Sequence, residues 1–222
     1  MLEDALRRLN EIVGNRKLRM HIEYSKLANA LKTAGSLLYE VKYSYVDGKT
    51  LAELEATKNL VSAIAEFADL FRAASKSQAY KPQSVKEKLA FTETQYSLSI
   101  VEGFEQRLLR AADDSAHAID ILAVEVSQIR DVAGSSNLTE CRCTDGSRIW
   151  TIVTNISSLE PGMKLPSAIL PPADMMGVVS EAMFLGGEPL SDDTKLGPLK
   201  NPSSQAIDQA RAQVLQITKR MI

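Results

Sequence analysis

The spacing of apolar residues along the chain changes at Ile119. This change constrains the possible folds of the chain more than any other feature of the sequence. Before this position, apolar residues recur at every third or fourth place, as on one face of a helix. From Ile119 to Val126 the chain is rich in β-branched residues and partly alternates apolar with polar, as a strand does. We therefore expect an α+β multidomain fold with a boundary near residue 118.

The part before this boundary is expected to form an antiparallel helical bundle, because its helices are long and its loops short. A short helix comes first, and an apolar seam from Met20 to Tyr45 then predicts one long helix. Capping-box patterns predict that later helices begin at Thr50 and at Ser84, and the last of them is expected to continue through Leu108.

The second part is expected to contain five short strands and a final helix. The strands are predicted at about residues 119–126, 139–144, 150–154, 165–170 and 177–185. Asp145-Gly146 predicts a hairpin, and Pro171-Pro172 is expected to end the fourth strand. Short strands at this spacing indicate a small sandwich or barrel. The final helix carries an apolar seam at Ile207, Ala210, Val214, Ile217 and Met221.

Composition and charge narrow the class of protein. With 45% hydrophobic residues the 222-residue chain can bury a core, so disorder is excluded. The net charge of -2 argues against an autonomous nucleic-acid binder, which is usually basic. The first residues lack the basic start and apolar block of a signal peptide, and no apolar run is long enough to span a membrane. We expect a cytoplasmic protein.

Motifs for catalysis and metal binding are missing from the sequence. Cys141 and Cys143 are the only cysteines, and the two histidines, His21 and His117, are far from them in sequence, so they do not make a zinc site. We found no phosphate-binding glycine loop and no hydrolase or metalloprotease motif. The sequence therefore predicts no catalytic residue, no cofactor and no metal, and the chain is not expected to be an enzyme.

Four sequence blocks follow one another in the second part. They are residues 150–156 (Trp-Thr-Ile-Val-Thr-Asn-Ile), 160–164 (Glu-Pro-Gly-Met-Lys), 170–172 (Leu-Pro-Pro) and 176–185 (Met-Gly-Val-Val-Ser-Glu-Ala-Met-Phe-Leu). In this order and spacing they resemble the tRNA-binding domain family. That family is the OB-fold module of methionyl-tRNA and some tyrosyl-tRNA synthetases, of endothelial monocyte-activating polypeptide-like cofactors and of free-standing tRNA-binding proteins.

The resemblance implies a fold and partners. Residues 119–200 would form a five-stranded OB-fold β-barrel, between a helical bundle domain at 1–118 and a C-terminal amphipathic helix at 201–222. The barrel would bind tRNA largely by shape and backbone, with an aminoacyl-tRNA synthetase as a further partner. Free-standing members of the family tend to pair, and a symmetric dimer would bury apolar seams that have no assigned partner, so we expect a homodimer.

The RNA-binding residues are predicted on the barrel. Arg148 and Trp150 share one strand face, where a cation and an aromatic ring can hold a base, although a tryptophan is often simply packed in the core. Asn155, Ser180 and Glu181 match polar positions of the family, and they either contact RNA or fix strand corners. The other candidates are Arg130, Asn137, Arg142 and Lys164.

The barrel departs from the family's basic pattern. Asn137 stands where the family has a lysine, and residues 119–222 hold nine bases against twelve acids. Residues 1–42 hold eight bases against five acids, and these cations either supply the missing positive patch or lie on solvated helix faces. The alternative to RNA binding is therefore an interaction scaffold whose barrel has weak or no RNA affinity.

Overall fold

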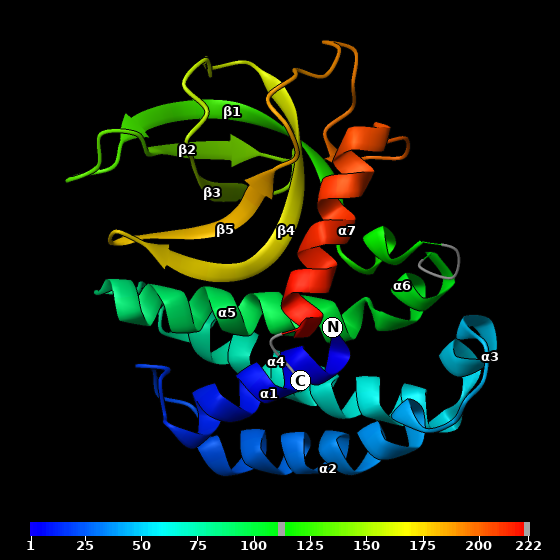
Figure 1. Ribbon diagram of the computed structural model, residues 1–222. Helices are drawn as coiled ribbons and strands as arrows, with labels where there is room; N and C mark the ends of the chain where they lie inside the picture. The colour runs from blue at the N-terminus through cyan, green and yellow to red at the C-terminus, as the bar shows by residue number, and fades with distance from the viewer. Residues whose placement is uncertain (111–113, 220–222) are drawn as a thin grey trace. The chain divides into compact units, whose positions relative to one another are not determined.

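Figure 1 shows the computed structural model, which describes residues 1–110 and 114–219. The chain divides into two compact units, one made of residues 1–118 with the last residues from Ile217, the other of residues 119–216. Met221, placed on the seam of the final helix by the sequence, lies outside the described residues. Helices therefore precede an antiparallel sheet and a terminal helix, so the α+β class is confirmed.

All regular elements in the described part of the first unit are helices. Its elements are α1 (Leu2–Gly14), α2 (Tyr24–Lys42), α3 (Gly48–Glu53), α4 (Glu55–Ser77), α5 (Val85–Glu102), α6 (Phe104–Arg110) and a 3₁₀ turn at Ser115–Ala118. α2 packs against α4, and α1 packs against both α2 and α5. Leu9, Leu27, Leu60 and Phe67 are fully buried between these helices, as the helical period predicts.

The ends of the helices in this unit are set by capping residues rather than by the ends of the apolar pattern. The cap predicted at Ser84 is confirmed, because its hydroxyl accepts from the Glu87 amide. The cap predicted at Thr50 is wrong: Asp47 is the cap, and it accepts from the Lys49 and Thr50 amides. The long helix predicted from the apolar seam between Met20 and Tyr45 is α2, which ends at Lys42.

A break at Gly103 divides the last predicted helix into α5 and α6. The guanidinium of Arg107 folds back and Nη1 donates to the carbonyls of Ser99 and Ile100, at the C-terminal end of α5. A Cβ on Gly103 would lie 2.3 Å from that Nη1 atom. Glycine at this position therefore leaves room for the buried arginine that satisfies the last carbonyls of the helix.

The second unit contains an open, antiparallel sheet and all but the last turn of the helix α7 (Ser204–Lys219). Its strands are β1 (Ile121–Asp131), β2 (Thr139–Thr144), β3 (Ile149–Thr154), β4 (Lys164–Met175), β5 (Val178–Phe184) and the two-residue β6 (Gly197–Pro198). Backbone pairing follows the order β3-β2-β1-β4-β5, and β6 pairs with β1. The sheet thus has six strands where five were expected.

The fourth strand is longer than predicted. β4 continues through Pro171 and Pro172 to Met175, although prolines cannot donate to a ladder. Pairing with β1 stops at Ala168, and the ladder with β5 is interrupted between Ile169 and Ala173. The prolines therefore lie where β4 pairs with neither β1 nor β5, and no backbone donor is missing from a ladder.

The two ends of this sheet are joined by side chains. Ser180 Oγ on β5 accepts from the Val153 amide on β3 at 3.0 Å, and Glu181 Oε2 accepts from the Thr151 amide at 3.2 Å. β3 and β5 form no backbone ladder, so these two side chains accept from the β3 amides in its place. We call them the β3–β5 seam.

No helix in the described part of the chain has both the length and the hydropathy needed to cross a membrane.

Candidate nucleic-acid interface

A groove of about 680 Å³ lies on the second unit. The β1–β2 connection, the end of β3, β4, β5 and α7 all contribute to its wall, and we call it the amide groove. Its lining is Asn137, Leu138, Val153, Thr154, Asn155, Ile156, Leu170, Pro171, Ala173, Met175, Ser180, Ala182, Met183, Phe184, Gln209, Ala212 and Gln213. The groove brings together three of the predicted site residues, Asn137, Asn155 and Ser180.

The lining of the amide groove is polar without being charged. Four carboxamides, those of Asn137, Asn155, Gln209 and Gln213, each offer donors and an acceptor. Between them lie apolar side chains such as Met175 and Met183, and none of the described residues in the wall is ionic. Such a surface can hydrogen-bond to base edges and pack against base faces, but it cannot neutralise phosphates.

Two of the three polar residues have a structural partner. Ser180 belongs to the β3–β5 seam, and its hydroxyl also bonds the Ala182 carbonyl at 3.1 Å. The carboxamide oxygen of Asn137 accepts from the Ser135 hydroxyl at 3.1 Å, which fixes its direction in the β1–β2 connection. Ser180 is buried, whereas Asn137 and Asn155 are exposed, so the two asparagines are the groups best placed to meet a ligand.

A second cluster contains Arg148, Trp150, Glu181 and Asp145. The Arg148 guanidinium lies over the Trp150 ring, 3.6 Å from its centroid, and donates to Glu181 Oε1. The indole nitrogen of Trp150 donates to Asp145 Oδ2 at 2.8 Å. The cation and the aromatic ring do share one face, as predicted, but they stack on each other and are tied down by two carboxylates.

The charge of this second cluster is set by Asp145 and Glu181. Burial would raise the pKa of Asp145, but hydrogen bonds from the Arg148 and Ser147 amides, the Ser147 hydroxyl and the Trp150 indole outweigh it, and the pKa is lowered. The two carboxylates of the cluster, those of Asp145 and Glu181, outnumber its single guanidinium. A phosphate is therefore not attracted here, and Glu181 holds the sheet together at the β3–β5 seam.

Three further predicted cations are placed apart from the amide groove. Lys164, at the start of β4, donates to the carbonyls of Asp192 and Thr194 and so fixes the loop between β5 and β6. Arg130 on β1 stands opposite Glu140, and Arg142 on β2 stands opposite Gln128. Both arginines are exposed on the β1–β2 surface.

Sequence reasoning missed the contribution of α7 to the amide groove. Gln209 and Gln213 are four residues apart on this helix, a spacing that places them on one face beside the buried Ala210 and Val214. That spacing was a usable signal, but only the fold brings this face to the sheet.

The two cysteines lie in the core, on one face of β2. Burial raises the pKa of Cys141 to about 11 and that of Cys143 to about 12, so both thiols stay protonated at neutral pH. In the part of the chain that the structure describes, no group of three metal-ligating side chains comes together around them or elsewhere.

Comparison with known proteins identifies the first unit. The alpha helical domain family matches residues 1–111, half of the chain. The chain belongs to the alpha helical domain family. The family's domain thus corresponds to α1–α6 and ends before the sheet.

Curated proteins give no match to the chain. Among solved structures, the crystal structure of a MetRS related protein from Pyrococcus horikoshii is similar at 23% sequence identity, with a TM-score of 0.32. The match covers 41% of this chain and 87% of that chain.

Proposed function

We propose that the chain is a tRNA-binding accessory protein that holds RNA in the amide groove. The observation that carries this proposal is the wall of the groove, where four carboxamides alternate with methionine and other apolar side chains. Unpaired RNA bases are recognised by hydrogen bonds to their edges and by packing on their faces, and this wall offers both. The role is binding rather than catalysis, and an aminoacyl-tRNA synthetase is the expected recipient of the RNA.

The strand order supports an OB-type barrel for this unit. β1 pairs with β2 and β4, β2 with β3, and β4 with β5, so that only a β3–β5 contact is needed to close the sheet. Ser180 and Glu181 supply that contact through side chains. An OB-fold is a partly open five-stranded barrel, and its loop between the first two strands contributes to ligand binding, as the Asn137 loop would here.

Electrostatics limits the strength of the proposed binding. Arg130 and Arg142 are exposed on the β1–β2 surface and can reach phosphates, whereas Arg148 and Lys164 are held by protein groups. Few phosphates would therefore be neutralised. Binding is expected to be weak to moderate and independent of tRNA sequence, because positional contacts to the backbone dominate.

The test places acids in the amide groove. Asn137→Asp with Asn155→Asp introduces two carboxylates that repel RNA at exposed positions, and a carboxylate at position 137 can still accept from the Ser135 hydroxyl. We expect filter binding of bulk tRNA at low salt to weaken by about tenfold or more. The matched control, Asn29→Asp with Asn59→Asp, makes the same charge change at exposed positions on α2 and α4. Equal affinity for both double variants would rule out the groove as the RNA site.

A second candidate function, an assembly scaffold, is favoured by exposed tyrosines. Tyr39 and Tyr43 on α2 stack with ring centroids 6.1 Å apart, and Tyr45 lies 6.3 Å from Tyr43. Their exposed fractions are 69%, 51% and 87%, and Tyr45 has a left-handed φ of 52°. Exposed tyrosines of this kind are typical of interface hot spots.

The scaffold role and the expected homodimer are tested together. If this surface pairs two chains, light scattering of the wild type gives about twice the mass of 24.3 kDa, and Tyr43→Ser with Tyr45→Ser returns the chain to that single mass. A monomeric wild type at high concentration would leave RNA binding as the better-supported role.

A further inference from the structure

A pocket of about 390 Å³ in the helical unit is lined with cations that the amide groove lacks. It lies between the connection from α1 to α2 and the beginning of α5, and we call it the basic pocket. The connection contributes Asn15, Arg16, Lys17 and Arg19, and α5 with its cap residue Ser84 contributes Ser84, Lys86, Glu87, Leu89, Ala90 and Glu93. Four cations and two carboxylates thus surround one cavity.

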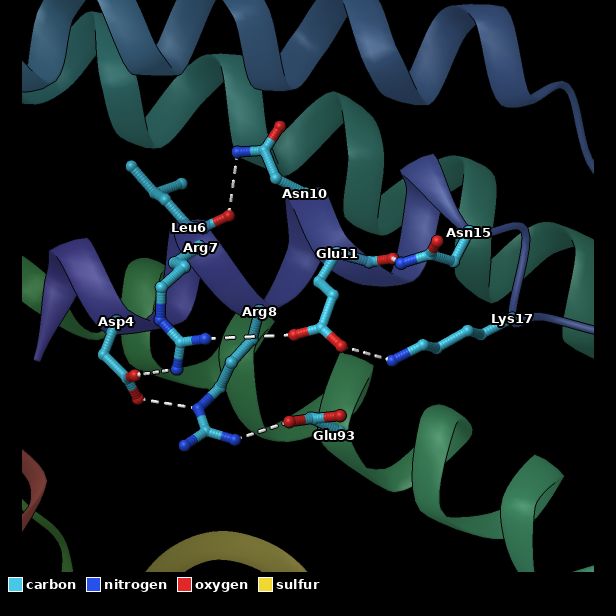
Figure 2. Close-up of polar contacts among 9 residues, drawn as sticks. All are labelled: Asp4, Leu6, Arg7, Arg8, Asn10, Glu11, Asn15, Lys17 and Glu93. Atoms are coloured by element: carbon cyan, nitrogen blue, oxygen red, sulfur yellow. Dashed lines mark hydrogen bonds and ion pairs between the residues drawn. The ribbon is translucent and has the colours of Figure 1, made fainter. Parts of the chain in front are cut away.

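Both carboxylates in this wall have a partner within the protein, and so does one of the four cations, Lys17. Figure 2 shows Glu93 paired with Arg8 and Lys17 paired with Glu11. The N···O distances of these two ion pairs are 2.5 Å and 2.6 Å. Glu87 completes the cap of α5 by accepting from the Gln83 amide at 2.9 Å. The charge of Glu93 is therefore paired with a cation outside the pocket, whereas Glu87 accepts from a neutral backbone amide.

The other three cations of the wall are not paired with carboxylates. Across residues 1–110 and 114–219, Arg16, Arg19 and Lys86 form no ion pair with a carboxylate. Arg16 lies over the Tyr24 ring at 5.7 Å, a contact that orients its guanidinium and leaves its charge in place. Lys86 is in the first turn of α5, where the helix dipole adds to the positive potential.

The connection that carries Arg16 and Arg19 is held in place from several sides. Arg16 has a left-handed φ of 48°, and the neighbouring Lys17 amide donates to the Ile12 carbonyl at 2.9 Å. Further along, the Tyr24 hydroxyl donates to the Leu18 carbonyl, and His21 exchanges backbone hydrogen bonds with the Gln78 carboxamide. The backbone that carries the two arginines is thus fixed before a ligand arrives, which lowers the cost of binding.

We propose that the basic pocket is a phosphate-binding site. Two guanidinium groups and one ammonium group around a cavity of this size suit the geometry of a phosphate or diphosphate group, which arginine binds in a bidentate manner. The ligand is either a small phosphorylated molecule or a phosphate of an RNA backbone. The site is independent of the RNA role of the amide groove.

Inorganic pyrophosphate is the probe that tests the pocket on the full chain. Titration followed by ¹H–¹⁵N NMR at constant ionic strength is expected to give saturable shifts for the amides of residues 15–19 and 84–87. In Arg19→Gln with Lys86→Gln the affinity is expected to fall by about tenfold or more, because two cations next to the anion are lost. Both positions are exposed, so folding is retained.

Lys32→Gln with Lys58→Gln is the matched control, since it removes two exposed charges from α2 and α4 outside the pocket. It is expected to bind pyrophosphate as the wild type does. Absence of saturable shifts in the wild type, or equal weakening in the two double variants, would overturn the proposal.

A tRNA titration of the same variants distinguishes the two sources of phosphate. If the pocket takes an RNA phosphate, the pocket variant lowers tRNA affinity and reduces the salt slope by about two. If it takes a small phosphorylated molecule, tRNA binding is unchanged while pyrophosphate binding is lost. Failure of tRNA to bind the wild type at all would count against the proposed function only.

Discussion

The guanidinium of Arg148 lies 3.6 Å from the ring centroid of Trp150. This stack is closed on its other sides by carboxylates, since Glu181 accepts from Arg148 and Asp145 accepts from the indole. The pair that the sequence offers as an RNA platform therefore stabilises the sheet. Arg148→Glu would place a third carboxylate here and destabilise the fold, so a loss of RNA binding in this variant would not identify an RNA contact.

Trp150→Ala is expected to destabilise the fold. The indole is half-buried, stacks under a guanidinium and donates a hydrogen bond, so its loss should cost roughly 2–4 kcal/mol in the free energy of unfolding measured with urea. Trp150→Phe keeps a ring for the guanidinium and should cost less than half as much. An alanine variant as stable as the wild type would mean that the stack is not formed in solution.

Ser180→Ala tests the β3–β5 seam. The change leaves the Val153 amide without its acceptor in a buried position, which should cost about 1–3 kcal/mol. Hydrogen exchange of the Val153 amide should accelerate far more than exchange of amides in the β1–β2 ladder. If exchange at Val153 does not change, the two strands are joined by another contact.

Gly103→Ala should destabilise the helical unit, because the added Cβ would meet Arg107 Nη1 at 2.3 Å. Moving the guanidinium breaks its bonds to the Ser99 and Ile100 carbonyls, with an expected loss of roughly 1–3 kcal/mol. Arg107→Ala should cost a similar amount, and the double variant should cost much less than the sum of the two. Additive losses in the thermal unfolding of the three variants would contradict this account.

Asp4 should make stability depend on acidic pH. Burial would raise its pKa, but hydrogen bonds and charges from Arg8 and Arg7 outweigh burial and hold the pKa below the ordinary value of an aspartate. A carboxyl with a lowered folded-state pKa contributes its full stability above the unfolded-state value, and the contribution is lost as pH falls through the folded-state pKa.

Asp4→Asn should therefore be less stable than the wild type at neutral pH, and the difference should shrink below about pH 4. Urea unfolding at a series of pH values measures this difference. Asp69→Asn is a suitable control, because Asp69 is exposed and its contact with Arg72 is long, at 4.0 Å. A difference that stays constant down to about pH 2 would contradict the assignment to Asp4.

Features set by distant residues were not predictable from the sequence, and features set by neighbouring residues were predictable only in part. The cap predicted at Thr50 from its neighbours was wrong, because Asp47 takes that role. The cap at Ser84 depends only on the next three residues, and the prediction was right. The prolines of β4 were expected to end the strand because a proline disrupts a ladder, but the strand leaves β1 at that point. Nothing local to Pro171 indicates where its neighbouring strand stops.

The same distinction holds for the candidate site. The polar character of Asn137, Asn155 and Ser180 was visible in the sequence, and the fold brings them to one groove. The partners of Lys164 lie 28 and 30 residues away along the chain, so its structural role was not visible. The contribution of Gln209 and Gln213 was missed for the same reason.

The most direct test of the central claim is a salt-dependent titration of bulk tRNA with the purified wild-type chain, with folding checked by circular dichroism. The account predicts retention at low salt and a shallow slope of about two to four released counterions, because few cations on the second unit are free to meet phosphates. A folded chain that retains no tRNA at low salt would contradict the account.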